Sequence, residues 1–168
     1  MVRIQMANER HVDGIISVCR AGYQDVSKGL LSDSYIEARC KAFYNADRVK
    51  KEVSHSGPSW GGYFVAIEND EVVGAGGGGM TDEKTSWLYV LYLNPLRRNE
   101  GIGTKLLQAI TDQQIEYGAK EQHVTVQKGN MKGIPFYEAR NFIFQKEIQS
   151  KDIKEEPRAV DLEYRREL

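Results

Sequence analysis

The sequence predicts a mixed domain of helices and strands, an α/β protein of the α+β type, whose sheet is mostly antiparallel. Apolar residues recur at helical spacing over 8–53, three β-rich runs follow one another between 63 and 94, and helical and strand patterns alternate from 101 onward. Strands joined by short turns pair antiparallel. A chain of 168 residues has room for one domain of ordinary size, so we expect residues 1–168 to form a single domain.

The first third of the chain predicts a short strand and two helices. After a strand over 2–6, Asn8 offers the side-chain oxygen of a helix cap, and apolar residues then recur every three or four positions. These apolar residues are Val12, Ile15, Ile16, Cys19, Tyr23 and Val26. The segment 32–53 predicts the second helix, because Ser34 and Glu37 have the spacing of a capping box.

The middle of the chain predicts a loop and three strands. Residues 54–62 have the Gly, Pro and Ser content of a loop. The β-rich runs that follow span 63–68, 71–80 and 86–94. Asn69 and Asp70 separate the first two runs, and this pair favours a two-residue hairpin turn.

The last third predicts helices and strands in alternation, closed by a strand pair. The pattern over 101–117 is helical, and Gly118 is a suitable helix stop. Pro135 fits the first turn of a short helix, because it lacks an N–H that would have no partner there. We expect strands at 123–127, 142–149 and 159–168, the short helix at 134–140, and a charged, mobile and solvated loop at 150–158.

The composition is that of a soluble globular protein with nearly balanced charge. The 23 Lys and Arg residues and 24 Asp and Glu residues leave a net charge of −1, which does not indicate a nucleic-acid or membrane partner. The first residues lack a charged-then-apolar leader, so we expect a cytoplasmic protein. Cys19 and Cys40 have no CxxC spacing and are interpreted as reduced core cysteines. No cluster of metal ligands is visible.

Two glycine-bearing stretches are candidates for a phosphate-binding loop. Residues 74–79 contain the spacing G-x-G-x-x-G, but a strand follows them, whereas a phosphate needs the free N–H groups of a helix that starts there. In the second stretch a strand leads to Arg98, Gly101 and Gly103, and a helix follows. Glycine lets an anion approach the backbone, and the helix dipole attracts it. The second stretch is therefore the predicted anion site.

Two motifs in this half of the chain resemble the GNAT superfamily of N-acetyltransferases, whose pyrophosphate loop reads [QR]-x-x-G-x-[GA] and whose later motif reads N-x-x-A-x-x-F-Y-x-x-x-G-F. The matching residues are Arg98, Gly101 and Gly103 in the first motif and Asn130, Phe136, Tyr137 and Phe142 in the second. Gly133 replaces the Ala, and Asn141 replaces the Gly, which is a mild change because Asn tolerates the left-handed conformation. The order of helices and strands along nearly the whole chain resembles that family too.

The resemblance implies a site for acetyl-CoA as co-substrate. The strand 87–93 would carry a bulge and splay from its parallel neighbour, 123–127, so that the pantetheine arm enters the gap. The sheet would stay mixed and mostly antiparallel, flanked by helices. The implied cofactor-binding residues are Leu91 and Leu93, which would act through the backbone, together with Arg98, Asn99, Glu100, Gly101, Ile102, Gly103, Thr104, Asn130 and Tyr137.

The resemblance also implies transfer of the acetyl group to a primary amine by direct attack through a tetrahedral intermediate. Tyr137 occupies the family's position for the acid that protonates the departing thiolate. Many relatives place a Glu base at positions that hold Trp87 and Thr125 here. His123 lies two residues before Thr125 and is a candidate base, with a structural role as the alternative.

The run Gly76–Gly79 is interpreted as part of the strand beside the bulged one. One hypothesis is that these glycines make room for the acceptor, with Trp60, Trp87 and Tyr89 as walls of its site. The alternative is a twisted or bulged strand without a ligand.

Three functions follow from these motifs. The first is an N-acetyltransferase for a small-molecule amine, such as a polyamine, an amino sugar or an amino acid. The second keeps the chemistry but takes a protein N-terminus or lysine as acceptor. The third is a non-catalytic CoA-binding regulatory module, which the missing carboxylates favour and Tyr137 disfavours. A homodimer paired through the terminal strands is left open.

Overall fold

The computed structural model describes residues 1–151 and 154–168. Its elements are β1 (Arg3–Met6), the 3-10 turn η1 (Glu9–His11), α1 (Val12–Ser27), α2 (Asp33–Phe43), α3 (Ala46–Val53), β2 (Phe64–Glu68), β3 (Glu71–Met80), β4 (Thr85–Leu93), α4 (Ile102–Glu116), β5 (Glu121–Gln127), α5 (Gly133–Glu138), β6 (Ile143–Gln149) and β7 (Val160–Glu167). The predicted order of strands and helices is confirmed, apart from one helix that is two.

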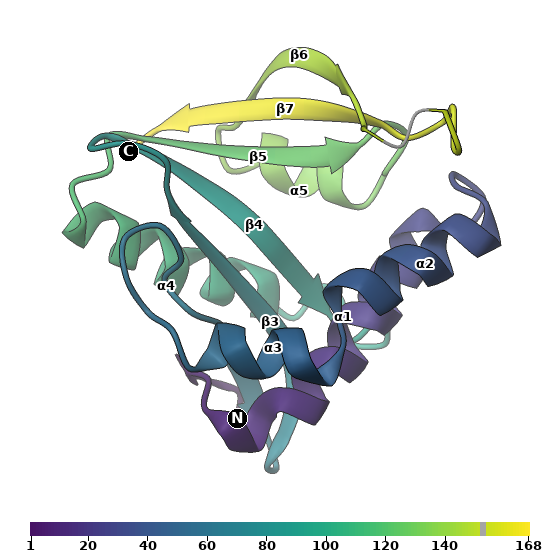
Figure 1. Cartoon of the computed structure of the whole chain (residues 1–168). Helices are drawn as coiled ribbons and strands as arrows, with labels where there is room; N and C mark the ends of the chain where they lie inside the picture. Colours follow the sequence, from purple (N-terminus) through teal and green to yellow (C-terminus); the bar gives the residue numbers. More distant parts are fainter. Residues whose placement is uncertain (152–153) are drawn as a thin grey trace.

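A seven-stranded sheet forms the centre of the molecule, in the order β1-β2-β3-β4-β5-β7-β6. Only β4 and β5 are parallel, and every other neighbouring pair is antiparallel. Helices α1 and α3 lie in front of β3 and β4, and α4 lies behind them (Figure 1). The predicted α/β class, with a mixed and mostly antiparallel sheet flanked by helices, is therefore confirmed.

The hairpin between β2 and β3 turns at the two predicted residues. Asn69 has φ of 51° and Asp70 has φ of 64°, both in the left-handed region. Two such residues in sequence make the turn whose twist matches that of the flanking strands. This prediction is confirmed.

The segment 32–53 was expected to form one helix, and this was wrong. Helix α2 ends at Phe43 and α3 begins at Ala46, because the Asn45 side chain competes with the helical backbone. Its oxygen accepts from the backbone N–H of Arg48 at 2.9 Å, and its amide donates to the carbonyl of Lys41 at 2.9 Å. One residue thus closes the first helix and caps the second.

The start of α2 also differs from the expected capping box at Ser34 and Glu37. The cap is Ser32, whose hydroxyl accepts from the backbone N–H of Tyr35 at 3.3 Å. Ser32 itself is fixed from outside the helix, since its own backbone N–H donates to the Glu156 carboxylate at 2.7 Å. A contact between residues so far apart in sequence leaves no local pattern.

The loop expected over 150–158 is present and most of its described residues are exposed, but that contact buries one of them. Residues 152 and 153 lie outside the described residues. Glu156 is only 3% exposed, and hydrogen bonds from Arg158 and Ser32 lower the pKa of its carboxyl to about 2. The described part of the loop is therefore anchored on the start of α2.

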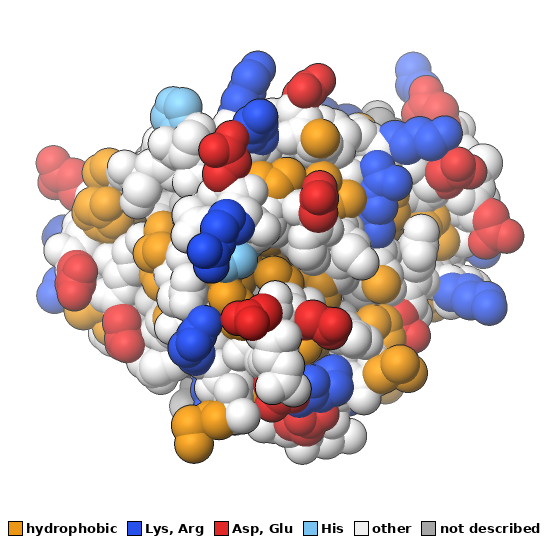
Figure 2. All heavy atoms as spheres, turned by 90° about the horizontal axis from the view of Figure 1, so that it is seen from below, with side chains coloured by type: hydrophobic (Ala, Val, Ile, Leu, Met, Phe, Trp, Pro, Cys, Tyr) orange, Lys and Arg blue, Asp and Glu red, His pale blue; other side chains and the backbone are white. Residues whose placement is uncertain are grey.

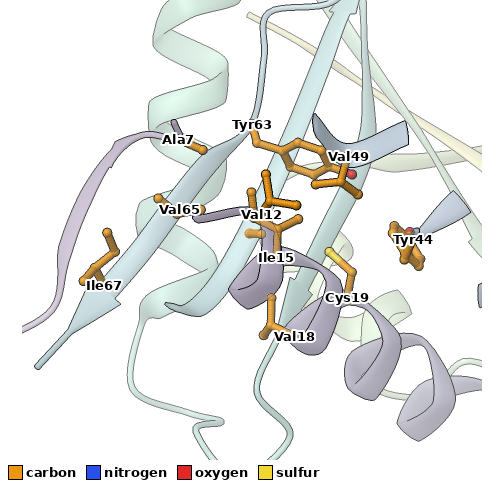
Figure 3. Close-up of a cluster of buried hydrophobic side chains, with 11 residues drawn as sticks. Ala7, Val12, Ile15, Val18, Cys19, Tyr44, Val49, Tyr63, Val65 and Ile67 are labelled. Atoms are coloured by element: carbon orange, nitrogen blue, oxygen red, sulfur yellow. The ribbon is translucent and has the colours of Figure 1, made fainter. Parts of the chain in front are cut away.

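The two cysteines lie in the core as free thiols, as the sequence predicted. Cys19 belongs to a cluster of buried side chains from α1, α3 and β2, drawn in Figure 3. Burial raises the pKa of its thiol far above the usual value, so the group stays protonated and unreactive.

The glycines of β3 let other parts of the protein approach both faces of this strand. A Cβ on Gly77 would lie 2.6 Å from the Trp60 ring, and one on Gly79 would lie 2.0 Å from the Ser59 carbonyl oxygen. On the opposite face, a Cβ on Gly76 would lie 3.0 Å from Ile110 of α4. The hypothesis that these glycines make room for the acceptor is therefore wrong, because the space beside them is filled by protein. The alternative of a strand without a ligand fits, with the bulge opposite Gly77 and Gly78 lying in the neighbouring strand β4.

A buried chain of hydrogen bonds joins α4 to three strands. The Gln114 amide donates to the backbone carbonyl of Trp87 in β4 at 2.9 Å, and its oxygen accepts from Gln122 of β5 at 2.9 Å. The Gln122 oxygen accepts in turn from Arg166 of β7 at 2.9 Å. Gln114 is 1% exposed and Gln122 is fully buried, so losing one partner would leave a polar group unpaired in the core.

Gly78 is required for this chain to form. A Cβ at this position would lie 2.1 Å from the Trp87 carbonyl oxygen and 2.7 Å from the Gln114 amide nitrogen. We predict that Gly78→Ala lowers the free energy of unfolding by about 2 kcal/mol or more, because backbone must move to relieve the overlap. Urea denaturation measures this. In Gly57→Ala the new methyl has no atom within 4 Å, so the control should lie within about 0.5 kcal/mol of the wild type.

Candidate active site

Strand β4 bulges and then parts from β5. Gly77 pairs with Val90 and Gly78 pairs with Leu88, so Tyr89 is an extra residue in β4. The parallel ladder joins Thr85–Leu88 to Glu121–Val124 only, and β4 and β5 diverge beyond it (Figure 1). The bulge and the splay expected from the resemblance are both present. From Tyr89 on, the β4 backbone has no ladder partner on the side of β5.

A cavity of about 490 Å³ occupies the gap and extends beneath the helices at the N-terminal side. Its walls include six of the residues that the sequence proposed for the cofactor: Leu91, Leu93, Arg98, Gly103, Asn130 and Tyr137. A volume of this size is typical of a pocket for a small ligand. The two motifs found in the sequence therefore meet at one cavity.

The start of α4 has the geometry of an anion site. Gly101 caps the helix with φ of 80°, and the first helical hydrogen bond runs from the N–H of Lys105 to its carbonyl. The N–H groups of Ile102, Gly103 and Thr104 therefore have no helical acceptor and sit at the positive end of the helix dipole. Donors arranged in this way bind phosphate oxygens.

Two neighbouring arginines at this helix start have different surroundings. Arg97 donates to Glu100 at 2.8 Å and to Glu68 at 2.8 Å. Arg98 is exposed, lines the cavity, and makes no ion pair with any residue that the structure describes. The Arg98 guanidinium is thus the one of the two that can serve a ligand.

The other proposed cofactor residues do not line the cavity with their side chains. Ile102 is 1% exposed and packs in the core, and Glu100 is bound to Arg97. Asn99 has φ of 62° and helps the loop turn, while the Thr104 hydroxyl accepts a hydrogen bond from Arg140. Any contact of these residues with a ligand would use the backbone.

The second motif supplies an amide and a phenol to the cavity. The oxygen of Asn130 accepts from the backbone N–H of Gly133 at 2.8 Å, which leaves its amide N–H groups for a ligand. Tyr137 is 8% exposed and packs edge-on against Phe136 and Phe142. Burial raises the pKa of the Tyr137 phenol, so its hydroxyl stays protonated as a hydrogen-bond donor.

His123 lies outside the cavity wall, in the part of β5 that is still paired with β4. Its ring stacks on Trp87 with centroids 4.8 Å apart. Nδ1 lies 3.4 Å from a Glu163 carboxylate oxygen, and Nε2 lies 3.6 Å from one of Glu121. Trp87 does not line the cavity either. The structure does not bring His123 together with Tyr137, and it fits the structural alternative.

The cavity has further walls that the sequence did not assign to the site. Three are carboxylates: Asp25 of α1, which forms an ion pair with Lys132, Glu52 of α3 and Asp161 of β7. Many of the others are aromatic: Tyr23, Tyr35, Phe43, Tyr44, Trp60, Tyr63, Tyr89 and Tyr92. Of these, only Trp60 and Tyr89 were expected near the acceptor. Nothing in the local sequence distinguishes the rest from ordinary core residues, because only the packing of the helices, the loop and β4 against one another turns them toward the gap.

Three further observations concern the surface charge, the metal-ligating side chains and the length of the helices. Acidic and basic side chains are interspersed on the face in Figure 2, in keeping with a net charge of −1. Within residues 1–151 and 154–168, no three metal-ligating side chains gather in one place. The helices of the described chain are too short or too polar to span a bilayer.

The comparisons with known proteins agree with this site. Residues 30–142 match the model of the family described as the Acetyltransferase (GNAT) family. The match covers well over half of the chain, so the chain belongs to the acetyltransferase (GNAT) family. The family and the class of enzyme predicted from the two motifs are thus confirmed. No curated protein sequence matches this chain.

Solved structures share this fold, and two of the three described next contain a coenzyme. PaiA N-acetyltransferase from Thermoplasma acidophilum, in complex with coenzyme A, superposes with a TM-score of 0.86 at 19% identity, covering 100% of this chain and 99% of that chain. A GNAT family acetyltransferase from Elizabethkingia anophelis with acetyl-CoA bound gives 0.67 at 13%, covering 99% and 98%. The ribosomal-protein-S18-alanine N-acetyltransferase from Escherichia coli gives 0.69 at 15%, covering 99% and 94%. At these identities the likeness shows the fold.

Arg98 provides a test of the anion site. We predict that Arg98→Gln raises the Kd for coenzyme A about tenfold or more, because a charge-assisted hydrogen bond to a phosphate is lost. Isothermal titration calorimetry at low salt measures the change. Lys120→Gln removes a charge just before β5, where the side chain does not line the cavity, and should leave the Kd unchanged. Equal weakening in both variants would indicate only a general electrostatic effect.

Proposed function

We propose that the protein is an acetyl-CoA-dependent N-acetyltransferase that acetylates the primary amine of a small molecule. The observation that carries the proposal is the convergence of the bulged, unpaired edge of β4, the start of α4 and Tyr137 on one cavity. The coenzymes bound to structural relatives support the same use of the gap. Acetyl-CoA supplies the activated acetyl group, as a thioester.

The residues of the chain divide the work of binding. Arg98 and the free N–H groups at the start of α4 would hold the pyrophosphate. The unpaired backbone of β4 at Leu91 and Leu93 would bind the pantetheine amides and polarise the thioester carbonyl, as preorganised N–H donors do. The amide of Asn130 would orient the arm from the opposite wall.

Tyr137 would protonate the thiolate as the C–S bond breaks. The leaving group is a thiolate, which is a weak base in water because its thiol has a pKa of about 8.5. Burial in the cavity favours the neutral thiol over the thiolate. The same burial keeps the Tyr137 hydroxyl protonated. Both groups favour their neutral forms in these apolar surroundings, so the Tyr137 hydroxyl is available to hydrogen-bond to the departing sulfur and to supply its proton.

The enclosure of the cavity supports a small acceptor over a protein. The aromatic side chains that line it come from α1, α2, the loop before β2, β4 and α5, so they surround the gap on several sides. The loop is fixed to β3, since Gly61 N–H donates to the Gly78 carbonyl at 2.9 Å and Met80 N–H donates to the Pro58 carbonyl at 2.7 Å. A peptide would need an open groove instead.

Two features support the remaining parts of the proposal. The free thiols of Cys19 and Cys40 suit a reducing compartment, which supports action in the cytoplasm.

The sheet ends at β6, most of whose residues are exposed, and an exposed edge strand can pair with a second copy to form a homodimer. Sedimentation velocity measures that association.

Tyr137 and a panel of acceptors test the function. We expect thiol release from acetyl-CoA with one class of acceptor among polyamines, amino sugars, amino acids and short peptides. Tyr137→Phe should lower kcat about tenfold or more with the Kd for acetyl-CoA nearly unchanged, because the lost hydroxyl acts on the leaving group.

Tyr117→Phe is the matched control, since this tyrosine is 40% exposed at the end of α4. It should behave as the wild type. Turnover with peptides alone would establish the protein acceptor, and coenzyme binding without any turnover would establish the regulatory module.

A further inference from the structure

Three carboxylates lie in the cavity wall, and Asp25 is already paired with Lys132 at 2.6 Å. The other two have no place in the proposed binding of the coenzyme. Glu52 lies near the end of α3, and Asp161 lies in β7, where it pairs with Gln127 across the ladder. The two therefore stand on different walls. An ammonium acceptor must lose a proton before it can attack, and a carboxylate is a suitable base if it reaches the amine.

The Glu52 carboxylate has spare capacity to accept hydrogen bonds. Its side chain is 23% exposed, and Oε2 lies 3.5 Å from Nε of Arg48. The Tyr63 hydroxyl also hydrogen-bonds to the carboxylate. Oε1 is buried and accepts no hydrogen bond within the part of the chain that the structure describes. An incompletely paired carboxylate in a half-buried place costs stability. An ammonium or amine donor in the cavity would remove that cost.

The position of Glu52 is fixed by the packing around it. The indole N–H of Trp60 donates to the backbone carbonyl of Glu52 at 2.9 Å. On the same helix, Val49 is fully buried and packs beside Tyr63 in the core drawn in Figure 3. A rigid backbone on both sides of the residue is what a functional carboxylate needs.

The same packing places Glu52 on the side of the cavity where β4 bulges. The Trp60 ring lies over Gly77, since a Cβ there would be 2.6 Å from Cη2. Gly77 pairs with Val90, the residue that follows the bulge. The chain of contacts from Glu52 through Trp60 to Val90 thus ends beside the backbone proposed to hold the thioester.

The surroundings of Glu52 also suit a base. Burial raises the pKa of its carboxyl, and the charge of Arg48 and the nearby Tyr63 hydroxyl act in the opposite direction. The third titratable neighbour is the Cys19 thiol of α1, whose own pKa is raised further by Glu52. A carboxyl with a raised pKa holds a proton more firmly than an exposed one and is still ionised near neutral pH while the shift stays moderate.

We propose that Glu52 is the general base of the reaction, an inference that rests on the proposed N-acetyltransferase function. The carboxylate takes one proton from the acceptor's ammonium, directly or through one water. The freed nitrogen lone pair forms the C–N bond to the acetyl carbon, the C–S bond breaks, and its electron pair goes to sulfur. The sulfur takes its proton from Tyr137, the Tyr137 phenolate regains a proton from the second one that nitrogen releases, and Glu52 gives its proton to solvent.

Asp161 is the matched alternative. Burial raises the pKa of its carboxyl too, and the nearby Arg39 charge opposes that effect. Its ladder partner Gln127 lies at the end of β5, on the wall opposite the bulged strand. Asp161→Asn therefore tests whether any cavity carboxylate would serve.

The experiment measures kcat against pH for the wild type, Glu52→Gln and Asp161→Asn, with the acceptor that the wild type turns over best. Glu52→Gln should lower kcat about 100-fold at neutral pH. It should also abolish the wild type's rise in kcat with pH at the acidic side, because that rise reports ionisation of the base. The Kd for acetyl-CoA should stay the same, and Asp161→Asn should keep the wild-type pH profile.

A second readout separates function from folding. Glu52→Gln removes a poorly paired charge without changing shape, so its Tm should equal or exceed that of the wild type. A normal pH profile in Glu52→Gln, or loss of the acidic limb in Asp161→Asn, would overturn the assignment while leaving the N-acetyltransferase function intact. A wild type that acetylates no amine would overturn both.

Discussion

The buried amide chain at the end of the parallel ladder is the constraint on which the rest of the site depends. Gln114 and Gln122 hold β4 and β5 together at Trp87, and the strands part directly after this point. If the parallel ladder continued past Leu88, the backbone N–H and C=O groups of β4 would be hydrogen-bonded to β5. If the ladder ended earlier, Gln114 of α4 would lose its contacts with β4 and β5. The start of α4 and Tyr137 both line the cavity that opens at the point where β4 and β5 part.

Much of the fold could be predicted because its signals are local. Helical periodicity, the turn at Asn69 and Asp70, and the glycines that precede α4 each depend on a few neighbouring residues. The residues proposed to bind the coenzyme could be identified from the sequence for the same reason, since Arg98, Gly103, Asn130 and Tyr137 lie in two short motifs. Their meeting at one cavity required the topology, which the family resemblance supplied.

The parts that could not be predicted depend on distant contacts. Ser32 caps α2 because Glu156 fixes it from far along the chain, and the side chain of Asn45 overrides a helical pattern that looks continuous. The acceptor side consists of single residues from separate helices, and Glu52 looks like any solvated charge near a helix end. Its burial appears only when α3 packs beside Trp60.

The parting of the strands also bears on aggregation. An unpaired strand edge ordinarily recruits strands from other molecules. Here the free edge of β4 faces the inside of a wedge, which closes at Leu88 and Val124 to the spacing of a normal ladder. An incoming strand, with side chains on both faces, has no room at the narrow end, whereas a thin and flexible chain can enter. The narrow end of the wedge thus suits a thin ligand better than another β-strand.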